Sequence, residues 1–148
     1  MAGSVSDIEY QRLLRFRTGL RRFERWSEEQ AQTAGLTSAQ HQLLLAVRGH
    51  PDRRGPTIGE LADYLLLRHH SVVELIDRAE SAGLVRRTAD PTDRRLVRLR
   101  PTRHGNAVLR RLTLSHLAEL ARLAAVYEGL WAGLEPTKHL PPSRRKEA

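Results

Sequence analysis

The chain has 148 residues, of which 40% are hydrophobic and 28% charged, as expected for a soluble protein with one globular domain. No apolar run reaches the roughly 18 residues that a membrane span needs, and no basic-then-apolar signal segment opens the chain, so we expect a cytoplasmic protein. The formal net charge of +8 indicates an anionic partner, and the absence of cysteine excludes disulfides, thiolate metal sites and thiol-based redox switches.

The first predicted element is a long amphipathic helix. Ser6 and Glu9 have the spacing of a capping box, which predicts a helix from about Asp7 to Thr33 that ends at Gly35. Apolar side chains recur on one face at the 3-4-3 spacing of a helical seam; they are Leu13, Phe16, Leu20 and Phe23. Arginines crowd the opposite face. A helix of this length with such a seam requires a partner helix.

Two further capping boxes predict two shorter helices. Thr37 with Gln40 opens the first, and a turn-rich loop over residues 49–56 ends it. Thr57 with Glu60 opens the second. The side chains that the first of these helices is expected to bury are Leu43, Leu44 and Val47.

The helix after Thr57 is followed at once by another. Each has one apolar stripe at i, i+3, i+4 and i+7; the stripes are Ile58, Leu61, Ala62 and Leu65, then Val72, Leu75, Ile76 and Ala79. The second helix stops at Gly83, where a left-handed residue is favoured. Two short helices in immediate succession predict a helix-turn-helix pair.

A β-hairpin is predicted next. Residues 84–88 and 96–100 alternate like strands, and turn-forming residues 89–95 separate them, so the hairpin has a charged tip and forms a wing. Alternation divides the second strand between an inward apolar face and an outward basic face: Val97 and Leu99 against Arg98 and Arg100.

The net charge is concentrated in and after this hairpin. Residues 84–111 contain nine arginines and two aspartates, so they carry +7 of the +8. Such a block usually faces a polyanion, and arginine suits phosphate and the DNA grooves. A basic surface that is merely solvated is the alternative.

Thr102 caps a final helix that we expect to reach about Gly133, either unbroken or divided near residues 124–126. Its apolar surface exceeds what a small domain can cover, so we expect both terminal helices to form a homodimer. The residues predicted at this interface are Leu13, Phe16, Leu20, Leu120, Leu123, Tyr127 and Leu130.

The predicted fold is mostly α-helical with a small β-hairpin wing. We divide the chain into an N-terminal dimerisation helix (1–35), a winged helix-turn-helix lobe (36–102), one or more C-terminal dimerisation helices (103–134) and a disordered basic tail (135–148).

Five motifs, in order and at matching spacing, resemble the MarR family (multiple antibiotic resistance regulators). They are residues 36–40, 57–62, 71–78 with 82–86, 90–95 and 102–105. The resemblance covers roughly residues 36–105 and implies a regulator of transcription. It further implies a homodimer on a pseudo-palindromic operator in double-stranded DNA, usually as a ligand-responsive repressor.

The helix that begins near Arg68 is expected to lie in the major groove. With its apolar stripe assigned to the core, the outward side chains are His69, His70, Ser71, Glu74 and Arg78. Histidine and serine can read base edges or phosphates, and Glu74 can accept from a cytosine amino group; some of these residues are otherwise only solvated. We expect no metal at His69 and His70, because neighbours on a helix diverge by about 100°.

In the wing, Asp93 is expected to pair with a nearby arginine. The resemblance implies that Arg94 or Arg95 enters the minor groove, and the sequence leaves both open. In the alternative interpretation, Asp90 and Asp93 only neutralise the surrounding arginines. The residues predicted to contact phosphates are Arg86, Arg87 and Arg98.

The resemblance also implies a small-molecule effector between the dimerisation helices and the DNA-binding lobe. Candidate lining residues are Trp26, His41, Tyr64 and His116, although ordinary packing is the commoner role of such residues. We expect no cofactor and no metal.

Other functional classes fit less well. An enzyme is disfavoured because the chain has no phosphate-binding glycine loop, no nucleophile elbow and no metal-ligand spacing. A winged helix that acts as a protein-interaction adaptor leaves the arginine cluster without a role. A nonspecific architectural DNA-binding protein is the third possibility, and it would bind any duplex equally.

Overall fold

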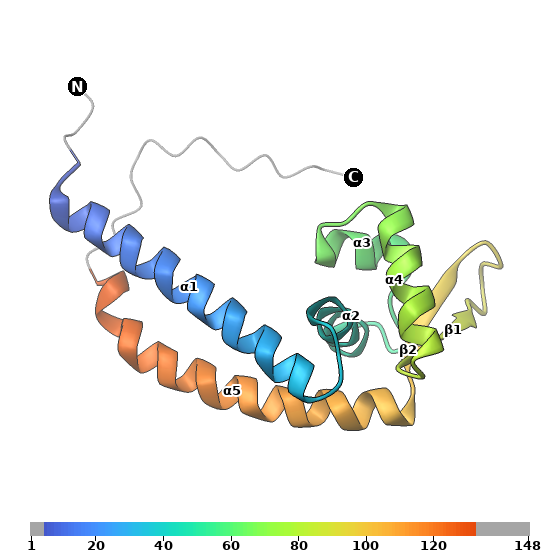
Figure 1. Cartoon of the computed structure of the whole chain (residues 1–148). Coiled ribbons are helices and arrows are strands. Elements are labelled where there is room, and N and C mark those ends of the chain that lie inside the picture. The colour runs from blue at the N-terminus through green and yellow to red at the C-terminus, as the bar shows by residue number, and fades with distance from the viewer. Residues whose placement is uncertain (1–4, 133–148) are drawn as a thin grey trace.

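A computed structural model of the chain describes residues 5–132. Within this range the elements follow the predicted order (Figure 1). They are α1 (Asp7–Thr33), α2 (Ser38–Gly49), α3 (Ile58–Leu65), α4 (His69–Ser81), β1 (Val85–Ala89), β2 (Val97–Pro101) and α5 (Arg103–Trp131). The predicted tail, 135–148, lies outside the described residues. None of the helices in the described part is long and apolar enough to cross a membrane.

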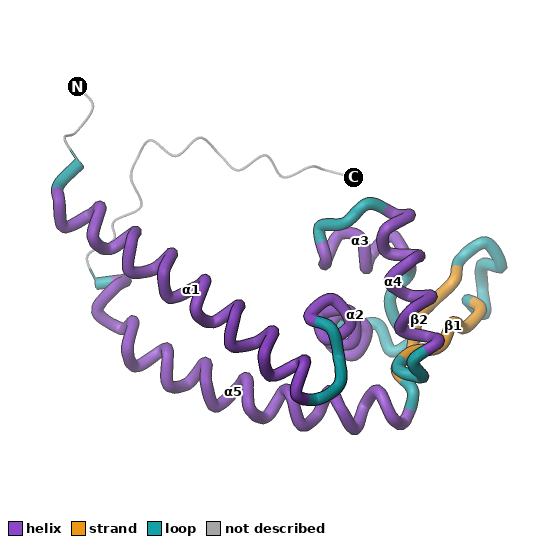
Figure 2. Tube along the Cα trace, viewed as in Figure 1, coloured by secondary structure: helices purple, strands orange, loops and turns teal. Residues whose placement is uncertain are grey.

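The elements form an arm and a lobe. The arm consists of α1 and α5, which lie side by side, and the lobe consists of α2, α3, α4 and the hairpin at one end of the arm, as Figure 2 shows. Helix α2 stands at the junction, since it contacts α1 and α5 as well as α3, α4 and β2. Helix α4 packs beside β1. This is a winged helix-turn-helix with two long terminal helices.

Side-chain caps begin most of the helices. Capping boxes at Ser6, Thr37 and Thr57 are present as predicted, each with its Glu or Gln partner on the cap backbone. Thr102 caps α5 by accepting from the Gly105 N–H at 3.0 Å. A cap of this kind stabilises a helix by about 1 kcal/mol, which explains why the predicted starts are accurate.

The core of the lobe consists of the predicted apolar stripes. Leu43, Leu44 and Val47 of α2 are buried. The stripe of α4 is also buried, at Val72, Leu75, Ile76 and Ala79, whereas α3 buries Leu61 fully and Ile58 and Leu65 only in part. Helix α2 is therefore covered on several sides and sets the positions of α3 and α4.

The turn between α3 and α4 has an unusual residue. Leu66 has a left-handed backbone with φ 53°, and its side chain is exposed. A non-glycine residue in this region costs about 1–2 kcal/mol. The left-handed Gly83, with φ 69°, ends α4 as predicted and without that cost.

One face of the hairpin differs from the prediction. Leu99 is fully buried as expected, but the outward position predicted for Arg98 is wrong, because Arg98 is only 7% exposed. The loop before α3 covers this face: the Leu99 N–H donates to the Pro56 carbonyl at 2.9 Å, and Thr57 forms a β-bridge with Arg98. Alternation within a hairpin does not reveal a loop that packs over it.

Helix α5 continues from Arg103 to Trp131 without a break, so of the two alternatives that the sequence left open, the structure has the undivided helix. Its C-terminal part packs on α1. The Arg15 guanidinium lies 5.7 Å from the centre of the Tyr127 ring and donates to the Val126 carbonyl at 3.0 Å. A Cβ at Gly19 would collide with the Tyr127 hydroxyl, so the two helices approach closely there.

This packing corrects part of the predicted dimer interface. Leu130 is buried within its own chain, at 5% exposure, and Tyr127 lies against α1. Leu130 therefore has little surface left for a second copy, whereas Tyr127 is half-buried and its place in the interface stays a prediction. The apolar seam of α1 therefore packs on one helix of the same chain, α5.

Candidate nucleic-acid interface

Helix α4 presents a polar face to solvent beside the hairpin. Its apolar stripe faces the core, and the exposed side chains are Arg68, His69, His70, Glu74 and Arg78, with Ser71 half-buried. All six therefore keep exposed or half-exposed side chains, and their contact with the major groove stays a prediction. Arg68 is the N-cap residue and makes no side-chain cap hydrogen bond, so the first N–H groups of α4 can receive an anion.

The wing tip distinguishes the two arginines that the sequence leaves open. Arg95 binds Asp93, with Nε 3.1 Å from Oδ1, and its own N–H donates to the same carboxylate at 3.0 Å. These contacts lower the pKa of Asp93. Arg94 is exposed and makes no ion pair among residues 5–132. Arg95 therefore secures the loop, and the charge of Arg94 is available to a partner.

The root of the wing is held by a buried carboxylate. Asp90 accepts from the N–H and hydroxyl of Thr92, both at 2.8 Å, and from the Asp93 N–H at 2.9 Å. Its other oxygen accepts from Arg98. The Arg98 guanidinium first, and then the Thr92 donors, hold the pKa of Asp90 well below its usual range.

Arg98 is consequently not a phosphate contact, and this prediction is wrong. Its guanidinium is buried against Asp90 and donates to the Gly55 carbonyl at 2.7 Å. It links the wing to the loop before α3, which is a structural role. The alternative interpretation, in which acidic residues neutralise the arginines, is thus correct for Arg98.

Arg87 ties the wing to α4. Its two terminal nitrogens lie 2.5 Å from Asp77 and 2.6 Å from Glu80, and its backbone N–H donates to Glu80 at 3.1 Å. Two carboxylates therefore compensate the charge that we predicted for a phosphate. Arg87 therefore joins the hairpin to α4, through Asp77 and Glu80, two partners that we did not predict.

Arg86 lies on the other face of the hairpin. Strand alternation places it opposite to Arg87, and its partner in the register is Arg100. Since Arg87 reaches α4, Arg86 is directed away from α4. This position argues against a contact with the duplex that α4 would bind.

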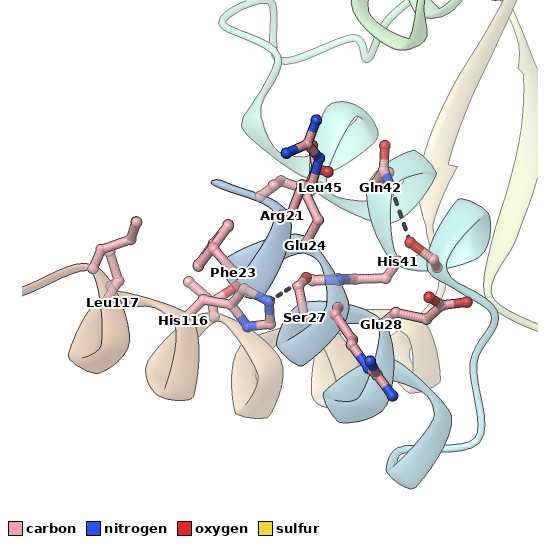
Figure 3. Close-up of a pocket in the computed structure, with 14 residues that line it drawn as sticks. Arg21, Phe23, Glu24, Ser27, Glu28, His41, Gln42, Leu45, His116 and Leu117 are labelled. Atoms are coloured by element: carbon pink, nitrogen blue, oxygen red, sulfur yellow. Dashed lines mark hydrogen bonds between the residues drawn. The ribbon is translucent and has the colours of Figure 1, made fainter. Parts of the chain in front are cut away.

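A groove of about 1000 Å³ lies where the arm meets the lobe. Figure 3 shows His116 of α5 beside Ser27 of α1, with His41 of α2 close by. The His116 Nδ1 donates to the Leu112 carbonyl at 2.7 Å, so a neutral ring accepts from the Ser27 hydroxyl at Nε2, also 2.7 Å away. The rings of His41 and His116 are 4.8 Å apart, edge to face.

Three of the four predicted effector residues meet at this junction. His41 and His116 line the groove, and the Trp26 ring packs on His116 at 4.8 Å. Tyr64 does not belong to this group, because it lies on α3 and bonds His50 at 2.9 Å. Ser27 was not predicted, and nothing in its local sequence distinguishes it from an ordinary exposed helix residue.

The arm keeps apolar side chains on its surface. Leu13 and Leu20 of α1 are 61% and 39% exposed, and Leu120 of α5 is 48% exposed. Phe16 is also partly exposed, and Leu123 is half-buried. Other exposed leucines of the two helices are Leu14, Leu114 and Leu117. Apolar patches of this extent mark protein contacts.

Comparisons with known proteins agree with this geometry. The model of the MarR family matches residues 34–96, which span the lobe from the start of α2 into the wing. A search of curated proteins finds none that matches. A crystallised MarR family transcription regulator is 26% identical, with 83% of this chain and 78% of that chain covered and a TM-score of 0.68.

Two further solved structures share the fold at lower identity. The MarR family transcriptional regulator AbsC from Streptomyces coelicolor is 22% identical over 87% of this chain and 95% of its own, with a TM-score of 0.66. The MepR–DNA complex from S. aureus is 21% identical over 75% of this chain and 80% of its own, with a TM-score of 0.63.

Proposed function

We propose that this chain, whose residues 34–96 match the MarR family model, is a member of that family and a sequence-specific regulator of transcription that binds double-stranded DNA as a homodimer. The observation that carries this proposal is the exposed polar face of α4 beside a wing whose tip arginine, Arg94, has no carboxylate partner in the described chain. The S. aureus relative, crystallised with DNA, supports the same function.

Helix α4 would enter the major groove. His70, Ser71 and Glu74 follow one another on its solvent side and have the donors and acceptors that base edges require. Arg68 and Arg78 flank them and suit phosphates on either side. The uncapped N-terminus of α4 adds N–H donors for one further phosphate.

The wing would place Arg94 in the adjacent minor groove. Arginine is favoured in narrow A·T-rich grooves, where the potential is most negative. Asp90 and the pair Asp93–Arg95 hold the loop in shape from within, so little ordering is required on binding.

The exposed leucines of the arm would form the dimer contact. A dimer with a two-fold axis at this surface has two lobes and therefore two copies of α4. If the two copies of α4 lie about 34 Å apart, their separation matches one turn of DNA. The operator would then be a pseudo-palindrome.

Effector control would act at the junction of arm and lobe. A ligand in the groove touches α1, α2 and α5 together, so it would change the angle between the two bodies and thereby the separation of the recognition helices. We propose repression, relieved by such a ligand. The protein would work in the cytoplasm and catalyse no reaction.

The test is a titration of the full chain with a duplex from its own promoter and with a scrambled duplex, at about 50 and 200 mM salt. We expect tighter binding to the promoter, with affinity falling steeply as salt rises. Equal binding to both duplexes would favour an architectural protein, and no binding at low salt would favour an adaptor.

Variants of the wing sharpen this test. Arg94→Ala should weaken promoter binding about tenfold, or about 1.4 kcal/mol, while the mass of the particle stays the same. Arg95→Ala is the matched control and should weaken promoter binding less, because Arg95 is already bound to Asp93. Equal losses would show that the assignment of Arg94 is wrong.

A further inference from the structure

Four arginines surround a second hollow, behind the wing. It has a volume of about 560 Å³ and lies between the end of α2, the loop before α3, the hairpin and the start of α5. Each of the first three parts supplies arginine; the residues are Arg48, Arg53, Arg86 and Arg100. We call this site the basic hollow.

None of these four arginines has a carboxylate partner among residues 5–132, whereas four other arginines of the lobe do. The compensated pairs are Arg54 with Asp52, Arg87 with Asp77 and Glu80, Arg95 with Asp93, and Arg98 with Asp90. Asp52, which lines the hollow, is bound by Arg54 through both oxygens. Asp52 and Asp90 are thus bound by Arg54 and Arg98, and the four arginines around the hollow keep their positive charge.

Two of the arginines face each other directly. Arg86 and Arg100 are partners in the antiparallel register, so their side chains leave the same face of the hairpin. Like charges in directly opposite positions destabilise a strand pair. An anion bound between them would remove this repulsion, and the planar guanidinium fork matches the oxygens of a phosphate.

The start of α5 adds to the same field. Asn106, in the first turns of α5, lines the basic hollow and carries an amide donor. The positive end of the α5 dipole lies at this end of the helix. The Asn106 side chain therefore adds a neutral donor to the four arginines.

We propose that the basic hollow binds a small anion that carries phosphate groups. Its volume falls within the range of small-molecule sites, about 300–1,000 Å³. Phosphates are also present in DNA, but no residue of α4 lines the hollow, and Arg86 is directed away from the face that Arg87 joins to α4. The ligand is accordingly a free phosphorylated molecule and not the operator backbone.

The test measures pyrophosphate binding to the full chain by calorimetry, without DNA and at constant ionic strength. We expect saturable binding that weakens at least about tenfold in Arg86→Gln/Arg100→Gln. Arg17→Gln/Arg22→Gln on α1 removes the same charge from exposed positions outside the hollow and should leave the affinity unchanged.

Three results would overturn the proposal. The first is the absence of saturable binding up to about 10 mM pyrophosphate, and the second is equal binding by both double variants. The third is a loss of promoter affinity in Arg86→Gln/Arg100→Gln together with a salt slope smaller by about two, which would assign the arginines to DNA. Because pyrophosphate is titrated without DNA, a failure here is distinguishable from a failure of the proposed DNA binding.

Discussion

At the scale of single residues, Asp90 connects the wing turn to the body of the lobe. Asp90→Asn keeps the shape of the side chain but leaves the buried Arg98 guanidinium without its carboxylate. We expect the melting temperature to fall by several degrees and promoter binding to weaken with it. Asp93→Asn is the control, because Asp93 binds the exposed Arg95, and its melting temperature should stay close to that of the wild type. Equal melting of the two variants would contradict the role of Asp90.

The sequence could not predict this contact for a physical reason. The sequence predicted the turn at residues 89–95. Strand alternation, applied to the hairpin alone, predicted an outward side chain for Arg98. The burial of Arg98 depends on Gly55 and Pro56, which are distant in the chain and pack over the hairpin only in the folded lobe. Contacts between separate loops have no local signal, whereas a cap and its partner lie three residues apart.

At the scale of elements, α1, α2 and α5 meet at the pair His41–His116. Burial first, and then the neighbouring His116, lower the pKa of His41 from its ordinary value of 6.5. The unfolded chain therefore takes up a proton at a higher pH than the folded chain does. The free energy of unfolding should fall as the pH drops through about 6.5 towards the lower pKa of the folded state.

Denaturant melts at a series of pH values between about 7.5 and 5 would measure this dependence. His41→Phe keeps a ring against His116 and cannot take up a proton, so its stability should change less over the same range. A variant with the pH dependence of the wild type would exclude His41 as its source. The control is His104→Phe, because His104 is exposed at the start of α5 and should leave the dependence unchanged.

The elements themselves were predictable to different degrees. Capping boxes marked the starts of α1 and α2, and Gly35 marked the end of α1, because these signals are local; α2 includes Gly49, which the sequence assigned to the following loop. The sequence left open whether α5 is divided near residues 124–126, and the structure has it unbroken where Arg15 of α1 contacts Tyr127. In the candidate site, α4 was predictable from its single stripe of apolar residues. The ion pairs of Arg87 with Asp77 and Glu80 were not predictable.

At the scale of the whole molecule, the arm has more apolar surface than its two helices cover. Leu13 and Leu120 remain 61% and 48% exposed after α1 and α5 have packed together. A two-fold partner would bury this surface, at about 25 cal/mol per Å² of apolar area. We expect the chain, of 16.8 kDa, to behave as a particle of twice that mass in light scattering.

Leu13→Glu/Leu120→Glu places four charges in the contact of a dimer and should yield a particle of 16.8 kDa. The lobe of this variant should stay folded, but each monomer binds one half of the operator without a linked second lobe. Promoter affinity should therefore fall by about 100-fold or more, since linked sites gain that much over single ones. Leu66→Glu, at a fully exposed leucine of the lobe, is the control for mass and should remain a dimer. A dimer in the double variant, or a monomer in the wild type, would show that the arm does not join two copies.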